Sequence, residues 1–246
     1  MKRTAWLLAA LFAVATVLPG TSQAQSLHGR SPDKAFQLRL GGFFPEGGGA
    51  LWNDNEERFT LRVEDFDDFV VGFTFVNAFS NDWEIGFNVD FYDEKVLSEE
   101  AMFVDEDGFP IFHDTRLEML PLSVDVRLLP GGRYRMRGRG ARVLKPVFYV
   151  GGGIGANVWE YEEVGDFVDD VDPNDPFVFF GRFKEEGVAF QAHVLAGFEF
   201  PMNPGFSLML EGRYAWADDE LNDELAAFDR IELGGASFFG GASFRF

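Results

Sequence analysis

The chain has 246 residues, with 21 lysines and arginines against 41 aspartates and glutamates, so its formal net charge is −20 at pH 7. That balance argues against nucleic acid as a partner, because phosphate binding needs a surplus of lysine and arginine. The 30 phenylalanines exclude a disordered chain, and the lack of cysteine excludes disulfides, thiolate metal sites and cysteine nucleophiles.

Residues 1–24 have the pattern of a secretory signal peptide. Two basic residues precede the apolar run AWLLAALFAVATVL, and Ser22 and Ala24 fit the small positions of a cleavage site. We therefore expect cleavage after Ala24, which leaves 19 basic and 41 acidic residues in a single domain, 25–246. An uncleaved membrane anchor is the alternative, but the run is shorter than the ~20 residues that a spanning helix needs.

Eight later segments alternate between apolar and polar or small residues, which is the period of a β-strand. In the clearest of them, Trp83, Ile85 and Phe87 oppose Glu84 and Asn88. The eight segments are 35–44, 68–78, 83–92, 119–129, 146–160, 187–200, 206–216 and 231–246. Their number is even, as in bacterial outer-membrane barrels.

The links between these segments alternate in length, as they do in transmembrane barrels with short periplasmic turns and long external loops. The long links are 45–67, 93–114, 161–186 and 217–229, and the short ones are 79–82 and 201–205. The link at 130–145 is intermediate in length and basic, and we expect a mobile periplasmic turn there. The predicted fold is all-β: an eight-stranded antiparallel transmembrane up-and-down β-barrel formed by residues 25–246.

A soluble eight-stranded lipid-carrier barrel is the structural alternative, and it would turn its apolar side chains inward. In this sequence one face of each segment is uniformly apolar, while the other holds glycine, hydroxyls and charges of both signs. That division favours a lipid-facing wall around a polar interior. Aromatic residues near the segment ends are typical of interfacial girdles, namely Trp83, Trp159, Tyr161, Tyr214 and Trp216.

The signal peptide, the alternating segments, the stretch KPVFYVGGGIGANVWEYEE and the aromatic C-terminus together resemble the small bacterial outer-membrane β-barrel proteins. This group includes the barrel of OmpA and the outer-membrane protein W family. The resemblance implies a bacterial outer-membrane location, outer-membrane lipids and lipopolysaccharide as surroundings, and a monomer. It also implies that Phe244 and Phe246, in the last strand, are read by the barrel assembly machinery during insertion.

Charged residues on the polar face of the segments should meet inside the barrel. Buried charges persist only when they are paired, so we expect a salt-bridged, side-chain-filled lumen. A proton or ion path is the alternative, with Gly151, Gly153 and Gly155 leaving local space. The predicted lumen residues are Arg39, Glu84, Asp90, Asp125, Arg127, His193, Glu199, Glu211, Arg213 and Arg245.

A structural or surface-interaction role fits this arrangement best, and a narrow channel or carrier for small, hydrophobic molecules is the alternative. A lipid A-modifying enzyme is a third hypothesis, because some outer-membrane barrels use a histidine, a serine and a carboxylate for that chemistry. His193 lies in QAHVLAG without a serine two residues away, and its parity points inward, so we predict no catalytic residue. A triad assembled from distant strands is the alternative. We also predict no cofactor and no dedicated metal site.

The acidic link 161–186 begins like a calcium loop at Asp170, but the match fails. Asp175 stands where that loop needs glycine, and Gly181 stands where it needs a bidentate glutamate. Cation bridging to lipopolysaccharide phosphates remains a hypothesis for this link, beside a plain solvated external loop.

The basic link carries six cationic residues and no acid, namely Arg133, Arg135, Arg137, Arg139, Arg142 and Lys145. At a periplasmic position they could meet anionic headgroups of the inner leaflet or acidic periplasmic polymers. A charged turn that aids solubility is the alternative.

Overall fold

The protein is described from a computed structural model, in which residues 33–105, 107–137, 141–169, 177–222 and 224–246 are placed. The described residues belong to one compact unit. The predicted signal peptide and its cleavage site after Ala24 lie outside the described residues.

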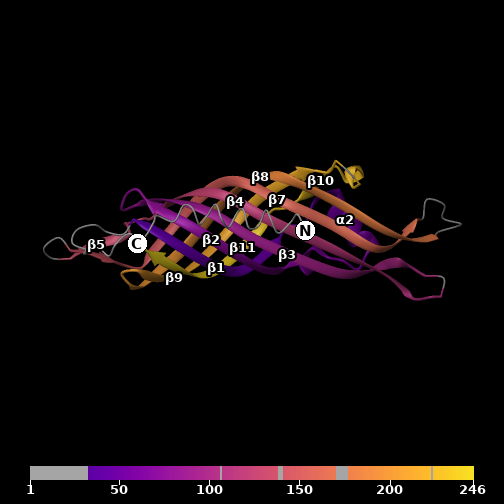
Figure 1. Ribbon diagram of the computed structural model, residues 1–246, viewed down its shortest axis with the longest axis horizontal. Coiled ribbons are helices and arrows are strands. Elements are labelled where there is room, and N and C mark those ends of the chain that lie inside the picture. The colour runs from indigo at the N-terminus through magenta and orange to yellow at the C-terminus, as the bar shows by residue number, and fades with distance from the viewer. Residues whose placement is uncertain (1–32, 106, 138–140, 170–176, 223) are drawn as a thin grey trace, which may run out of the picture. The chain divides into compact units, whose positions relative to one another are not determined.

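Eight long strands form a closed antiparallel ring (Figure 1). In ring order β9 is followed by β11, β1, β2, β3, β4, β7 and β8, and β8 pairs with β9 again. The strands are β1 (Lys34–Pro45), β2 (Asp68–Ala78), β3 (Trp83–Val104), β4 (Pro110–Leu128), β7 (Val147–Asp169), β8 (Phe177–Asn203), β9 (Phe206–Glu220) and β11 (Gly235–Arg245). This arrangement confirms the all-β, eight-stranded up-and-down barrel.

The first and last strands close the ring. Arg245 pairs with Ala35 in the β1–β11 register. The amide of Phe246 donates to the carbonyl of Lys34 at 3.0 Å. Within the closed ring each long strand has a paired neighbour on both sides, which is the usual requirement for backbone placed in lipid.

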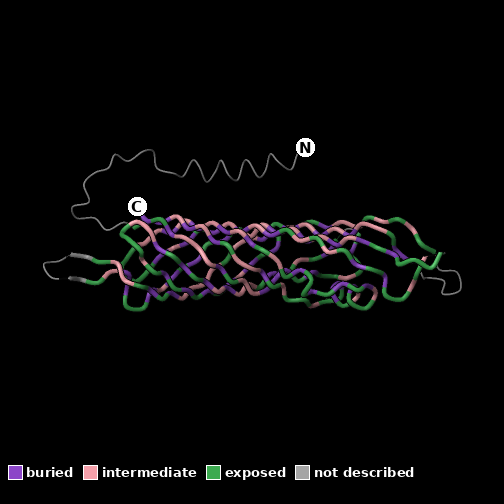
Figure 2. The backbone as a smooth tube through the Cα atoms, turned by 90° about the horizontal axis from the view of Figure 1, so that it is seen from below, coloured by how far each residue is buried: buried purple, intermediate pink, exposed green. Residues whose placement is uncertain are grey.

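The barrel has two distinct ends. At the end here called the base, β1 begins, β11 ends, and short turns join β2 to β3 and β8 to β9. At the opposite end, here called the mouth, the links that follow β1, β3, β7 and β9 leave the ring. The alternation of buried and exposed positions along the strands can be followed in Figure 2.

Four strands extend much farther toward the mouth than their apolar pattern predicts. Most residues of the links predicted at 93–114 and 161–186 belong to β3, β4, β7 and β8. In this region β3 pairs with β4, with Ser98 opposite His113, and β7 pairs with β8, with Val164 opposite Arg182. The prediction of long loops there is wrong. Backbone pairing continues where the outward side chains become charged, so the apolar period ends before the strand does.

The link after β1 is also structured. It contains helix α2 (Gly49–Arg58) and the short 3-10 helix η1 (Val63–Phe66), and both contact the barrel strands. Leu51, Trp52 and Phe66 are almost completely buried. The apolar side chains of this link therefore fill the mouth instead of forming a solvated loop.

The predicted last strand is interrupted. Strand β10 (Arg230–Glu232) pairs only with β9, after the 3-10 helix η2 (Ala226–Phe228), and β11 starts three residues after β10 ends. The continuous strand predicted for 231–246 is therefore wrong at its first residues. Gly234 lies at the break, where an added Cβ would approach the carbonyl oxygen of Ala215 to 2.7 Å.

The basic link forms a β-hairpin of its own. Strands β5 (Tyr134–Arg137) and β6 (Ala141–Leu144) pair with each other in a separate two-stranded sheet at the base. Arg133, immediately before β5, is 2% exposed. The prediction of a mobile turn is wrong for the described part of this link, since its base is fixed to the barrel.

Candidate functional site

The outer wall carries an apolar band of bilayer dimensions. On β3 the outward residues are apolar from Trp83 to Phe91, and the next ones, Asp93 and Lys95, are charged. This stretch of nine residues agrees with the ~9–11 that a tilted strand needs to cross a bilayer. The other strands expose similar residues, among them Leu40, Val124, Ile154, Val194, Leu210, Phe238 and Phe244.

Charged pairs lie on the outer face of β3 and β4 just beyond this band, on the mouth side. Arg116 contacts Asp93 at 2.5 Å and Glu118 at 2.6 Å, and Lys95 contacts Asp114 at 2.7 Å. An apolar wall bounded by charge, around a polar interior, is the reverse of a soluble barrel. The chain is a β-barrel of the transmembrane kind. Among the described residues, no helix is both long and apolar enough to span a bilayer.

All ten predicted lumen residues point inward and are at most 6% exposed. Six of them form a group, here called the central cluster, which consists of Arg39, Arg127, Arg213, Asp90, Asp125 and Glu211. Arg39 donates to Asp90 at 2.6 Å and to Glu211 at 2.7 Å, and Arg127 donates to Asp125 at 2.7 Å. Three guanidinium groups face three carboxylates, so the cluster is neutral as a whole.

A second group closes the lumen near the base and is here called the base cluster. Glu84 and Glu199 each contact Arg245 at 3.3 Å. Arg133 enters from the basic link and lies 2.7 Å from Glu84 and 2.8 Å from Glu199. Two carboxylates again face two guanidinium groups.

Sequence reasoning missed Arg133 as a lumen residue. A charge count gave the only available signal, because the predicted inward set near the base held Glu84 and Glu199 but only Arg245 to neutralise them. The missing positive charge had to come from a link, and the basic link is adjacent.

His193 is the only predicted lumen residue outside both clusters. It is 2% exposed, and neither ring nitrogen has a hydrogen-bond partner among the described residues. A Cβ added to Gly153 would lie 2.7 Å from its ring, and one added to Gly155 would lie 2.1 Å from the carbonyl oxygen of Leu122. The space expected beside these glycines is therefore occupied by His193 and by the neighbouring strand.

An apolar plug fills the barrel on the mouth side of the central cluster. The link after β1 contributes Leu51, Trp52, Phe59, Leu61, Val63 and Phe66, here called the plug residues. Trp52 packs edge-on against Phe66 and Tyr161, and its indole N–H donates to the carbonyl of Glu232 at 3.2 Å. The same core also contains side chains from all eight strands of the ring, which therefore surround the plug residues.

Two residues predicted for the interfacial girdle belong to this core. Trp159 is 3% exposed and Tyr161 is completely buried, so their prediction as girdle residues is wrong. Both lie at inward positions of β7, and parity along the strand decides the face. Trp83 and Trp216 do lie on the outer wall, at 42% and 52% exposure.

A serine and a histidine meet beneath the plug. Ser98 Oγ lies 3.0 Å from His113 Nε2, on neighbouring strands beyond the apolar band. Burial lowers the pKa of His113 to about 4. Such a pair could serve nucleophilic catalysis, but the ring of Phe59 covers His113 at 3.9 Å and Ser98 is 3% exposed. Sequence reasoning missed this pair, whose two residues lie fifteen positions apart.

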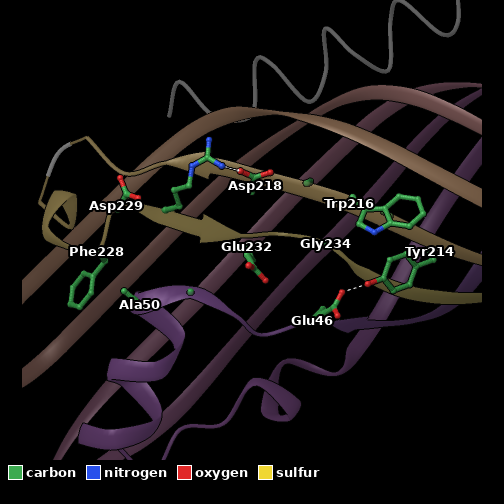
Figure 3. A pocket seen from close by; sticks show the side chains of 13 residues that line it. Glu46, Ala50, Tyr214, Trp216, Asp218, Phe228, Asp229, Glu232 and Gly234 are labelled. Carbon is green, nitrogen blue, oxygen red and sulfur yellow. Dashed lines mark hydrogen bonds and ion pairs between the residues drawn. The ribbon is translucent and has the colours of Figure 1, made fainter.

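Two cavities at the mouth are lined by link residues as well as by strands, and another, about 490 Å³, is lined by β3, β4 and β7 alone. The larger of the first two, about 670 Å³, lies on the wall where β10 pairs only with β9. Figure 3 shows Glu46 bonded to the hydroxyl of Tyr214 on one side, and the guanidinium that pairs with Asp218 on the other. The smaller, about 300 Å³, lies between α2 and the β7–β8 hairpin. No group of three metal-ligating side chains occurs among the described residues.

The acidic link is only partly described. Asp170 and Asp175 lie outside the described residues. Glu162 pairs with Arg182, and Glu185 accepts from the backbone amide of Leu225 at 3.0 Å. The described part of the acidic link therefore already uses these two carboxylates in contacts within the chain.

Comparisons with known proteins are limited to likeness of structure. No protein-family model matches the sequence, and no curated protein matches it. Among solved structures the chain is similar to the outer membrane protein OprG from Pseudomonas aeruginosa, at 12% identity and a TM-score of 0.47, over 88% of this chain and 97% of that one.

Two further similar structures are the N-terminal β-barrel domain of Pseudomonas aeruginosa OprF and the Neisserial surface protein A. The first has 10% identity and a TM-score of 0.40, over 88% of this chain and 100% of that one. The second has 10% identity and a TM-score of 0.40, over 87% and 97%. The strand pairing of this chain itself establishes its fold.

Proposed function

We propose that the protein is a monomeric bacterial outer-membrane barrel with a structural and surface-contact role, and that its lumen does not conduct. The mouth then faces outward and the base faces the periplasm, as the resemblance to small outer-membrane barrels implies. Outer-membrane lipids and lipopolysaccharide surround the apolar band, and the barrel assembly machinery inserts the chain.

The neutral, fully buried central cluster carries this proposal. Its charges are matched within the cluster, so none is left to attract a permeating ion. The plug residues cover the cluster on one side, and the base cluster covers it on the other. Eight strands enclose only enough space for side chains or one small ligand. A barrel whose lumen is filled in this way has no path for solutes. Its role is then to support the membrane and to present the links at its mouth to contacts at the cell surface.

Planar-bilayer recording tests the closed lumen. We expect no stepwise current from the folded wild-type protein at any voltage that the bilayer survives. The matched variant replaces the three arginines of the central cluster by alanine, which removes side-chain volume and three positive charges and should allow cation current. Regular current steps from the wild-type protein would refute the proposal.

A carrier for small apolar molecules is the second candidate, favoured by the smaller cavity at the mouth. Its walls include Phe59, Phe167, Phe179, Phe183 and Phe228. An apolar fluorescent probe should bind there and lose affinity in Phe179→Ala. Transfer of the probe into protein-containing vesicles, beyond that into protein-free ones, would favour the carrier over the structural role.

A lipid A-modifying enzyme would need the plug to move away from Ser98 and His113. Mass spectrometry of lipid A incubated with the folded protein tests this hypothesis. We expect no change in lipid A mass, and a product that disappears in Ser98→Ala would establish the enzyme.

A further inference from the structure

The smaller cavity at the mouth, about 300 Å³, combines an aromatic lining with an excess of negative charge. Five phenylalanine rings line it, together with four carboxylates and one cationic side chain, that of Arg58. The carboxylates are those of Asp54, Glu163, Asp169 and Glu224. Four negative charges against one positive charge give the lining a net charge of −3. A cavity of this charge attracts cations and repels anions.

The register of β7 against β8 groups the rings beside one of these carboxylates. Glu163 lies opposite Phe183, and Phe167 lies opposite Phe179. Side chains that face each other across two strands have Cβ atoms about 4.5–5.5 Å apart. A Cβ added to Gly181 would lie 2.9 Å from the ring of Phe167 and 3.1 Å from that of Phe183. The glycine therefore lets the rings converge next to Glu163.

Glu163 is the deeply buried carboxylate of the lining, at 5% exposure. Its Oε1 accepts from the hydroxyl of Tyr161 and, at 3.1 Å, from the amide nitrogen of Asn55. No described residue donates to its Oε2. Burial raises the pKa of the Glu163 carboxyl above its ordinary value, because water no longer stabilises the negative charge. A donor on a bound ligand would supply that stabilisation.

Arg58 does not fill this role. Its Nη2 donates to the carbonyl of Val168 at 3.3 Å, and its guanidinium lies 5.9 Å from the centre of the Phe59 ring. Among the described residues it forms no ion pair with Glu163. The cavity therefore retains a buried carboxylate oxygen, beside aromatic rings, that the chain itself does not pair.

We propose that this cavity is a binding site for a small ammonium ion with an apolar body, of the arylalkylamine class. Aromatic faces attract a cation through their quadrupole, and a charged donor forms the stronger kind of hydrogen bond with a carboxylate. The ammonium group would lie between Glu163 and Phe183, and the apolar body among the rings of Phe167 and Phe179. The proposal shares this cavity with the carrier hypothesis, but it does not require transfer across the membrane.

Isothermal titration calorimetry of the full chain, folded in a zwitterionic detergent, tests the proposal with a matched pair of probes. Phenethylamine is an ammonium ion at neutral pH, and phenethyl alcohol has the same apolar body without the charge. The test variant is Glu163→Gln, whose side chain keeps its shape and can still accept from Asn55 and Tyr161. The control variant is Glu162→Gln, which removes the same charge from the outer face of β7, where Glu162 pairs with Arg182.

We expect the wild-type protein and Glu162→Gln to bind phenethylamine at least about tenfold more tightly than phenethyl alcohol, because hydrogen bonds between charged partners are about twice as strong as neutral ones. Glu163→Gln should lose at least about tenfold in affinity for the amine. Its affinity for the alcohol should be unchanged, which shows that the cavity is intact. Phe183→Leu removes a ring but keeps apolar volume, and should weaken amine binding about threefold or more. Unboiled gels verify the folding of each variant, and Phe183→Leu decides the question if Glu163→Gln does not fold.

Three results would overturn the proposal. Equal affinity of the wild-type protein for both probes would remove the preference for ammonium, and would leave the carrier hypothesis standing. Equal losses in Glu163→Gln and Glu162→Gln would show that surface charge alone attracts the amine. Failure of the wild-type protein to bind either probe would refute this site and the carrier hypothesis together, without bearing on the structural role.

Discussion

Among the carboxylates of the lumen, neutralising Glu211 should cause the largest loss in the free energy of unfolding. It accepts from Arg39 at 2.7 Å, from Arg213 at 3.0 Å and from the hydroxyl of Tyr149 at 3.0 Å, and its side chain is completely buried. Glu211→Gln preserves the shape but leaves three guanidinium groups facing two carboxylates. Removing one partner of a buried ion pair costs about 3–5 kcal/mol. Because glutamine can still accept a hydrogen bond, we expect a loss of about 3 kcal/mol.

Urea unfolding of the barrel in detergent micelles, followed on unboiled gels, measures this loss. Glu220→Gln is the matched control on the same strand, because Glu220 is 68% exposed and lies 3.9 Å from Arg230. An exposed pair of that kind contributes less than about 1 kcal/mol. Equal unfolding midpoints for the two variants would refute the charge-matched lumen.

A double variant tests the neutrality of the central cluster. Adding Arg213→Gln to Glu211→Gln leaves Arg39 with Asp90 and Arg127 with Asp125, both at 2.6–2.7 Å. The cluster is then neutral again. We expect the double variant to be less destabilised than the sum of the single variants by about 1–3 kcal/mol, and strict additivity would contradict the interpretation.

Three further predictions concern assembly, the plug and pH. Deleting Phe246, which we propose with Phe244 as the assembly signal, should lower the amount of folded protein in the outer membrane; an unchanged amount in membrane fractions would count against it. Trp52→Ala should cost about 3–5 kcal/mol of unfolding free energy through the cavity left in the plug, while exposed Leu97→Ala should cost little. His113 is neutral when folded, since burial lowers its pKa from 6.5 to about 4. Its contribution to stability is therefore complete above pH 6.5 and decreases as the pH falls toward 4, because the unfolded chain takes up the proton first. His113→Gln should weaken that dependence in thermal unfolding, and an identical pH profile would refute the assignment.

The apolar period of the sequence was sufficient to predict the ring. Trp83 to Phe91 alternates cleanly because every second side chain meets lipid and the others meet the lumen. The same period failed where the strands leave the lipid. Beyond Asp93 both faces of β3 carry polar residues, so no pattern distinguishes a paired strand from a loop.

Residue type and parity along the strands were sufficient to predict which residues face the lumen. They were not sufficient to predict which of those residues contact one another. The sequence places Arg39 and Glu211 on inward faces, but they are 172 residues apart. Only the register of β1 against β11, and that of β11 against β9, makes them neighbours. The plug was missed because its apolar residues are divided between the ten-residue helix α2, the 3-10 helix η1 and the residues that join them, so no period extends over enough turns to be recognised. The burial of Trp52 can be inferred only once the ring of strands is known, because the interior of its mouth is the space that this side chain fills.

A cysteine scan of β3 tests the central claim, a closed barrel with lipid outside and a charged lumen inside, most directly. The chain has no native cysteine, so Phe87→Cys, Asn88→Cys, Val89→Cys and Asp93→Cys each introduce a single site for a spin label in lipid vesicles. We expect labels at 87 and 89 to be reached by oxygen dissolved in the lipid, the label at 88 to be shielded, and the label at 93 to be reached by a water-soluble relaxation agent. Uniform accessibility along 87–89, or contact with water at 87, would contradict the account.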